Sequence, residues 1–245
     1  MSIDKFKKRA KKLLGPQLME YARYVRTFFL SCFGKSVYCF RDIKLLAESA
    51  GGRPDDGYGA WHVATDSLSS ASIIYSAGIG DDISFDLALI SRLKCRIHAM
   101  DPTPESHFWL SKQTLPPELI LHKFGLAVHD GVQYFHPAAI EGWVSHSIFK
   151  TRVTKEEAIA LPVKRISTIM KELGHTRIDL LKMDIEGAEY DVLDDLLRSK
   201  IACHQLLIEF HHRSLQDGVG KTRAAVEELR KHGYRLYHMT GNGEE

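Results

Sequence analysis

The sequence predicts an α/β fold with a central parallel sheet, helices on both faces of the sheet and an N-terminal helical extension. Short apolar runs of strand length alternate with segments of helical spacing between residues 72 and 239. One of these runs, 178–183, ends directly at the acidic residues Asp184, Glu186 and Glu189. A continuous apolar run is typical of a strand buried on both faces, and open α/β sheets bind ligands at the carboxyl ends of such strands.

Composition limits the classes of protein to consider. The 245 residues are 44% hydrophobic, which suffices for a sizeable core, and the net charge is +2. Residues 1–12 carry a local charge of +5, so the remainder, at −3, is not basic, which argues against a nucleic-acid enzyme. The four cysteines form no C-x-x-C pair and no metal-ligand spacing with histidines, which favours reduced thiols and a cytoplasmic location. No apolar run reaches the ~18 residues that would indicate a transmembrane helix.

We divide the chain into an N-terminal helical extension, 1–57, and a ligand-binding domain, 58–245. In the extension, residues 3–14 form one apolar stripe with lysines on the other faces, and 18–33 is rich in aromatic residues. A basic amphipathic helix can lie on an anionic membrane surface, where each basic residue contributes about 1 kcal/mol. The alternative, which we favour, is an ordinary helical extension packed on the domain.

The elements of the domain are expected in a regular order. Residues 42–50 have the pattern of a short helix ended by two glycines, and a turn-rich loop follows. Beyond it, a strand, a glycine loop, a helix and a second strand form the first half of a nucleotide-binding α/β unit. Their ranges are 72–76 for the first strand, 77–80 for the loop, 82–93 for the helix and 96–100 for the second strand.

The glycine loop indicates the kind of ligand. Gly78 and Gly80 allow a sharp turn on which a ligand can lie, and Asp101, at the end of the second strand, can accept hydrogen bonds from two ribose hydroxyls. A dinucleotide site would require a third glycine at the position of Ile83, whose side chain would crowd a pyrophosphate. This disfavours a nicotinamide oxidoreductase. A ligand with a ribose but no phosphates, such as S-adenosylmethionine, fits better.

The second half of the domain continues the alternation. A third strand is expected over 120–126, followed by short β pieces that form an excursion above the sheet edge. We expect the histidines of this excursion, His129, His136 and His146, at the surface or in a substrate pocket, with the surface favoured. The remaining predicted elements are a helix capped by Ser167 through Leu173, the strand 178–183, a helix over 188–197, the strand 205–210, a helix over 222–232 and a final strand over 234–239.

The chain resembles the FkbM-type family of S-adenosylmethionine-dependent methyltransferases. The closest likeness is Asp179-Leu-Leu-Lys-Met-Asp-Ile-Glu-Gly-Ala-Glu189, and shorter pieces at 75–85, 98–104, 208–211 and 233–236 support it. The resemblance implies a class I methyltransferase fold, also called Rossmann-like, with bound S-adenosylmethionine. It also implies O-methylation of a hydroxyl on a sugar, a polysaccharide precursor or a natural product. The cofactor contacts are then expected at Ser76, Gly78, Ile79, Gly80, Asp81, Asp101, Pro102 and Leu126.

Two positions depart from the usual class I pattern. Ser76 stands where many class I enzymes have an acid, and Asp82 where a third glycine often stands. A class I sheet also ends in an antiparallel seventh strand, whereas here residues 240–245 give only a turn. The sheet is therefore expected either to be cut short or to keep an open edge that another chain could pair with.

Methyl transfer to a hydroxyl needs in-line approach of the oxygen and a base for its proton. Candidates project from the ends of the strands 178–183 and 205–210: Asp184, Glu186, Glu209 and His211. His211 is the first choice as base because its reference pKa is near neutral, with Asp184 or Glu209 orienting it. A divalent metal held by Asp184, Glu209 and His211 is the less favoured alternative.

The partners expected are a small-molecule or glycan substrate and no nucleic acid. The competing interpretation is a non-catalytic, membrane-associated ligand-binding or scaffold module on the same fold. The convergent ionisable groups near His211 disfavour it, because a scaffold does not need them.

Overall fold

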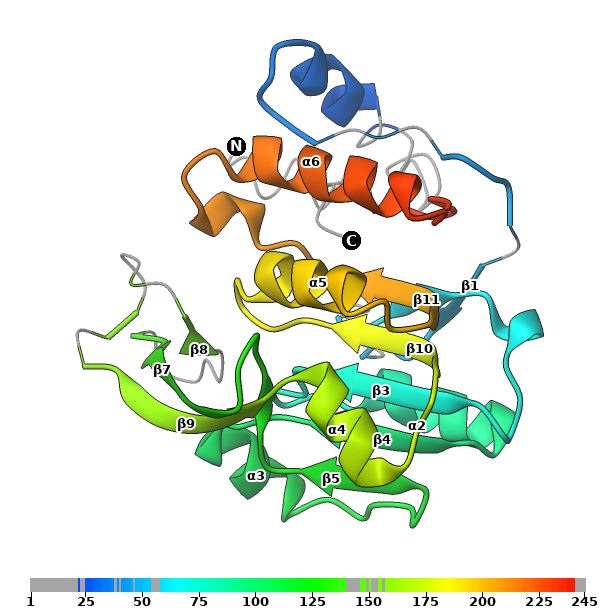
Figure 1. Ribbon diagram of the computed structural model, residues 1–245, viewed down its shortest axis with the longest axis vertical. Helices are drawn as coiled ribbons and strands as arrows, with labels where there is room; N and C mark the ends of the chain where they lie inside the picture. Colours follow the sequence, from blue (N-terminus) through cyan, green and yellow to red (C-terminus); the bar gives the residue numbers. More distant parts are fainter. Residues whose placement is uncertain are drawn as a thin grey trace, which may run out of the picture.

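A computed structural model of the chain has a layered α/β architecture with a central five-stranded sheet (Figure 1). It describes residues 22, 25–37, 39, 41–45, 47–53, 58–139, 146–148, 150, 154–155 and 157–240. The predictions for residues 1–14 and for the turn after Thr240 lie outside the described residues. Within the described ranges, no helix is both long and apolar enough to cross a membrane.

The central sheet is parallel throughout and has the order β11-β10-β3-β4-β5. Its strands are β3 (Ile73–Ala77), β4 (Arg96–Met100), β5 (Leu119–His122), β10 (Ile178–Met183) and β11 (Cys203–Ile208). The chain crosses from one side of β3 to the other, since β4 and β5 lie on one side and β10 and β11 on the other. The predicted fold class is confirmed, and this crossing creates a ligand crevice at the carboxyl ends of β3 and its neighbours.

Helices cover both faces of this sheet (Figure 1). Side chains of α4 (Ile166–Leu173) and α5 (Glu189–Arg198) form one apolar core with Tyr75, Leu181 and Met183. Side chains of α2 (Ser84–Leu93) form the other with the alternate strand residues, among them Ile74 and Leu180. Burial on both faces explains why the strands are apolar at almost every position.

A second, four-stranded sheet has the order β6-β9-β7-β8 and lies at the carboxyl ends of the central strands (Figure 1). Its strands are β6 (Gly125–Leu126), β7 (Gly131–Pro137), β8 (His146–Ser147) and β9 (Ile159–Lys164). The expected third strand over 120–126 is therefore wrong in detail, because the chain leaves the central sheet after β5 and β6 pairs with β9 instead. The predicted β excursion is confirmed in the described residues, and the short helix α3 (Pro104–Leu110) precedes it.

Before β3, the chain forms β1 (Glu48–Ala50), which pairs antiparallel with β2 (Trp61–Val63), and the short 3-10 helix η1 (Thr65–Ser67). The helix expected over 42–50 is wrong, since its last three residues are a strand. Gly51 lies directly against α2, because a Cβ there would come within 2.5 Å of the Phe85 backbone. Residues 48–51 are thus packed against the domain.

The C-terminal part of the chain is a helix followed by an extended segment. After the 3-10 helix η2 (His212–Ser214), α6 (Gly218–Lys231) begins four residues before the expected Thr222 and lies between α5 and the helical residues 25–32 (Figure 1). Arg223 of α6 donates hydrogen bonds to the carbonyls of Ser31 and Ser36. The expected capping by Ser167 is also absent, because α4 begins at Ile166 and has no side-chain cap.

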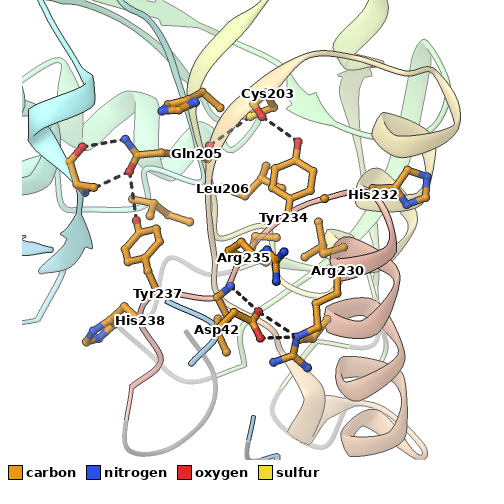
Figure 2. A pocket seen from close by; sticks show the side chains of 18 of the residues that line it. Asp42, Cys203, Gln205, Leu206, Arg230, His232, Tyr234, Arg235, Tyr237 and His238 are labelled. Atoms are coloured by element: carbon orange, nitrogen blue, oxygen red, sulfur yellow. Dashed lines mark hydrogen bonds and ion pairs between the residues drawn. The ribbon is translucent and has the colours of Figure 1, made fainter. Parts of the chain in front are cut away.

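The final strand expected over 234–239 is wrong. Side chains attach this segment to β11, as Figure 2 shows: the Tyr234 hydroxyl donates to the Cys203 carbonyl and the Tyr237 hydroxyl to Gln205 Oε1. The Leu236 amide donates to Asp42, which also pairs with Arg230. The segment therefore lies beside the sheet edge over a groove of about 1100 Å³ without adding a strand.

Candidate active site

A small cavity lies at the carboxyl ends of β3, β4 and β10, where the crossing of the sheet predicts a ligand crevice. Its volume is about 100 Å³. Its lining includes many of the residues expected from the sequence to form the site: Gly78, Ile79, Gly80, Asp81, Asp101, Pro102, Leu126, Asp184 and Glu186. The other lining residues are Tyr58, Met100, Thr103, Gly125, Phe135, His146 and Ile185.

The glycine loop after β3 passes very close to the end of β10. Gly78 has φ +79°, and a Cβ at this position would lie 1.6 Å from the Asp184 carbonyl oxygen. Its amide donates to the Met100 carbonyl at 3.0 Å, and the Asp184 amide donates to the Ala77 carbonyl at 3.1 Å. The loop is therefore fixed between β4 and β10, and only glycine can occupy its first turn.

Asp101 holds the same loop from the β4 side. Its Oδ2 accepts the amides of Ile79 and Gly80 at 2.9 and 3.0 Å. Its Oδ1 accepts the Thr103 amide at 2.8 Å and the Thr103 hydroxyl at 2.6 Å. A carboxylate has about four acceptor positions, so a ribose hydroxyl would bind Asp101 by replacing one of these donors.

Tyr58 and Arg53 border the cavity from the segment before β2. Arg53 pairs with Asp81 at 2.8 Å and lies over the Tyr58 ring, 4.7 Å from its centroid. Burial raises the pKa of Tyr58 to about 12, with the charges of Asp184, Glu209 and Asp81 acting in the same direction. The Tyr58 phenol is therefore neutral at physiological pH and can donate a hydrogen bond toward the cavity.

Next to the cavity, three carboxylates surround one imidazole. His211 Nε2 lies 3.7 Å from Asp184 Oδ1 and 3.6 Å from Glu186 Oε2, and its Nδ1 lies 2.8 Å from Glu189 Oε1. Glu189 is fully buried and also accepts the amides of Ile185 and Gly187. Glu189, rather than the expected Asp184 or Glu209, thus orients the imidazole through Nδ1.

This environment determines the charge of His211. Burial by itself lowers the pKa of the imidazole, but the hydrogen bond to Glu189 and the charges of Glu189, Glu186 and Asp184 outweigh it and raise the pKa to about 10. In the ligand-free site at neutral pH, His211 is an imidazolium. It neutralises part of the surrounding negative charge.

Three ligand atoms in this cluster have the separation of a metal site. One atom each from Asp184, Glu186 and His211 lie within 4.8 Å of one another. Carboxylates and imidazole suit divalent ions, and a histidine whose second nitrogen is bound to a buried carboxylate is the usual outer arrangement of such sites. The metal site considered from the sequence consisted of Asp184, Glu209 and His211. The structure brings Glu186, and not Glu209, together with the other two.

Three predicted site residues lie outside the cavity lining. Ser76 is fully buried within β3, and Glu209 uses its amide to donate to the Met183 carbonyl at the end of β10. His211 does not line the cavity, but its Nε2 lies 3.7 Å from Asp184 and 3.6 Å from Glu186, which do.

The cavity is covered by the second sheet. Phe135 of β7 and His146 of β8 are only 6% and 5% exposed and line the cavity. For His146 the favoured surface position is wrong, and the alternative, a position in a pocket, holds: it lines the cavity, and its Nε2 lies 3.3 Å from Glu105 Oε2. The neighbouring Ser147 hydroxyl donates to the Glu186 carbonyl at 3.0 Å, which attaches the cover to the acidic cluster.

A five-stranded parallel sheet with a glycine loop, an acid after the next strand and ionisable groups at the ends of adjacent strands is the arrangement of the Rossmann-like methyltransferases. The family model for the methyltransferase FkbM domain matches residues 76–236, more than half of the chain. The chain therefore belongs to the FkbM family of methyltransferases.

Curated relatives agree with this assignment. The chain is 28% identical to human "Probable methyltransferase-like protein 24" and 27% identical to its Rattus norvegicus counterpart, in each case over 176 residues, or 67% of this chain. It spans 42% of the length of these two relatives. An 85-residue part, 34% of the chain, is 35% identical to 4% of the AMB antimetabolite synthetase AmbE of Pseudomonas aeruginosa. No solved structure matches the chain significantly.

Proposed function

We propose that the chain is an S-adenosylmethionine-dependent O-methyltransferase whose acceptor is a hydroxyl of a sugar, a polysaccharide precursor or a natural product. The observation that carries the proposal is the single cavity shared by the Gly78–Gly80 loop, Asp101 and the carboxylates of Asp184 and Glu186. S-Adenosylmethionine is the usual methyl donor of this family. A hydroxyl-bearing acceptor suits a cavity with carboxylate acceptors on one side.

Binding of a complete donor requires the cover to shift. Ligand pockets usually have volumes of about 300–1,000 Å³, whereas this cavity has about 100 Å³ between the glycine loop and the residues Phe135 and His146. The floor of the site is formed by loops that follow strands of the central sheet, so we expect the outward movement in β7 and β8. The donor then occupies the loop end of the cavity and the acceptor the acidic end.

The acceptor hydroxyl must lose a proton as it attacks the methyl group. Asp184 is the proposed proton acceptor, because it lines the cavity, whereas His211 does not line it and is protonated at neutral pH. His211 and Glu189 hold Asp184 and Glu186 in place. In this proposal the imidazolium positions the carboxylates, and most of the rate gain comes from aligning the oxygen with the donor methyl.

The proposal is tested first by calorimetric titration with S-adenosylhomocysteine and with NAD. Binding of S-adenosylhomocysteine without binding of NAD supports the donor assignment, and the reverse result excludes it. A screen of sugar and natural-product hydroxyls with methyl-labelled donor then identifies the acceptor. Once an acceptor is identified, Asp184→Asn should reduce turnover by about 10²-fold or more. If His211→Gln reduces turnover more than Asp184→Asn does, His211 is the base.

A divalent ion is the alternative way to activate the hydroxyl, and the separation of the Asp184, Glu186 and His211 atoms favours testing it. Titration of Mn²⁺ followed by electron paramagnetic resonance should show one bound ion that Glu186→Gln releases if a metal is held here. If a chelator leaves turnover unchanged, no metal takes part, and Asp184 accepts the proton without one.

A non-catalytic ligand-binding module is the other candidate from the sequence. It shares the donor site but predicts no transfer to any acceptor. Binding of S-adenosylhomocysteine together with an absence of labelled product over the whole acceptor screen would favour this module.

A further inference from the structure

A buried lysine lies directly beneath the glycine loop. Lys182 belongs to β10, where its neighbours Leu180, Leu181 and Met183 are fully buried, and it is itself only 6% exposed. Its Nζ donates a hydrogen bond of 2.6 Å to the carbonyl of Gly78. The ammonium group thus contacts the loop that forms one wall of the cavity.

The surroundings of this ammonium group combine an aromatic ring with two buried polar side chains. Its Nζ lies 5.1 Å from the centre of the Trp61 ring. In the register of the sheet, Lys182 stands opposite Ser76 of β3, which is fully buried. Asp86 of α2 is 2% exposed, and its charge interacts with that of Lys182. One cation and one carboxyl group are therefore enclosed between the sheet and α2.

Such burial is costly unless the charge has a partner. Removing an ammonium group from water is unfavourable, and a methionine of similar length would fill the same space without that cost. Two groups offset this cost: Asp86 by its charge and the Gly78 carbonyl by accepting a hydrogen bond. The hydrogen bond to Gly78 is the contact that connects Lys182 to the glycine loop.

We propose that Lys182 is a positioning residue of the methyl-donor site, which fixes the Gly78 carbonyl and thereby the orientation of the Ile79 and Gly80 peptide groups. This inference rests on the proposed function, because the loop is the expected donor contact. Lys182 holds a carbonyl of the loop from below, while Asp101 holds two amides from the β4 side. The Lys182 ammonium group faces a carbonyl oxygen, which carries partial negative charge, and the Asp101 carboxylate faces two amide hydrogens, which carry partial positive charge. The loop is therefore ordered before the donor binds.

The decisive variant is Lys182→Met, which removes the charge and keeps the length of the side chain. We expect binding of S-adenosylhomocysteine, measured by calorimetry, to weaken about 10-fold or more, because a hydrogen bond to a charged group is lost. The urea midpoint of unfolding should change little, because burial raises the pKa of Asp86, so its carboxyl group can take up a proton once the ammonium group is gone. Lys171→Met, at an exposed position of α4, is the matched control and should change neither quantity.

A second measurement does not depend on the ligand. Hydrogen–deuterium exchange of a peptide covering residues 77–81 should be faster in Lys182→Met than in the parent chain, while exchange in α4 and α5 stays unchanged. Lys182→Gln, which is smaller, takes the place of the Met variant if the latter does not fold, with the same expected direction in both measurements.

The outcomes separate this inference from the proposed function. If the parent chain does not bind S-adenosylhomocysteine, the proposed function fails, and loop exchange alone decides the role of Lys182. Unchanged binding and unchanged loop exchange in the variant would overturn the inference. So would a loss of binding that is accompanied by a general loss of stability and faster exchange throughout the sheet, because Lys182 would then serve the core.

Discussion

Gly78 and Gly174 have nearly the same backbone conformation but different surroundings. Their φ angles are +79° and +71°, both in the region that favours glycine. At Gly78, a Cβ would lie 1.6 Å from the Asp184 carbonyl, whereas at Gly174, which ends α4, no heavy atom lies within 4 Å of that position. The pair therefore separates the effect of backbone strain from the effect of contact between the loop and β10.

We predict that Gly174→Ala lowers the free energy of unfolding by about 1 kcal/mol, the usual cost of a positive φ angle for alanine. Gly78→Ala should cost several times more, since the loop or β10 must move, and should abolish binding of S-adenosylhomocysteine. Urea denaturation and calorimetry of both variants measure these effects. Equal losses in the two variants would show that the loop can move away from Asp184 at little cost.

The raised pKa of His211 gives a prediction with a defined sign. Because its pKa in the folded chain is about 10, compared with about 6.5 when unfolded, the protonated imidazole stabilises the fold fully below about pH 6.5. This contribution is lost as the pH rises toward 10. His211→Gln should therefore lower the free energy of unfolding by a larger amount at pH 7 than at pH 9.5, as measured by urea denaturation. An equal loss of unfolding free energy at both pH values would contradict a protonated His211.

At the level of single residues, spacing in the sequence predicted the position of a site residue where one short segment fixes that position. Gly78, Gly80 and Asp101 could be placed together because strand, loop, helix and strand bring them to one sheet edge. Lys182 and His146 were missed for a different reason. Lys182 stands within an apolar run that indicates only a buried strand, and the inward turn of His146 depends on the pairing of β8 with β7.

At the level of elements, the errors occur where distant segments pair. Residues 48–50 carry a helical pattern but form β1, because β2 offers an antiparallel partner 13 residues later. The segment 234–239 alternates as a strand does, yet tyrosine hydroxyls rather than main-chain amides reach β11. Tertiary contacts override local propensity in both cases. The strands of the central sheet, whose apolar runs require burial on two faces, were predicted to within a few residues.

Gln205 of β11 joins two of these distant segments, as Figure 2 shows. Its amide nitrogen donates to the Ala64 carbonyl at 2.8 Å, and its Oε1 accepts the Ala64 amide at 3.1 Å. Gln205→Leu should lower the free energy of unfolding by about 1–3 kcal/mol, because both Ala64 groups are buried and would lose their partner. His204→Leu, at an exposed neighbouring position, is the control for urea denaturation. An equal effect of the two changes would show that the Ala64 groups find other partners.

At the scale of the whole molecule, residues 48–53 are part of the folded unit. Glu48 pairs with Arg92 of α2, the Gly52 amide donates to the Ser84 hydroxyl, and Arg53 pairs with Asp81 beside the cavity. We predict that a chain of residues 58–245 has a lower urea midpoint of unfolding than one of residues 47–245 and binds S-adenosylhomocysteine more weakly. Equal midpoints would mean that β2 and α2 are stable without this segment. The sequence could not indicate this dependence, since each contact joins residues more than 20 positions apart.

The cavity has a floor and a cover of separate origin. Its floor consists of loops that follow strands of the central sheet, whereas its cover is one inserted sheet that is attached to the floor through Ser147 and Glu186. Under the proposed function, exchange of Phe135 or His146 would change which acceptor is admitted and leave the glycine loop and Asp101 intact. A chain built in this way can diverge in acceptor preference during evolution without rebuilding its chemistry.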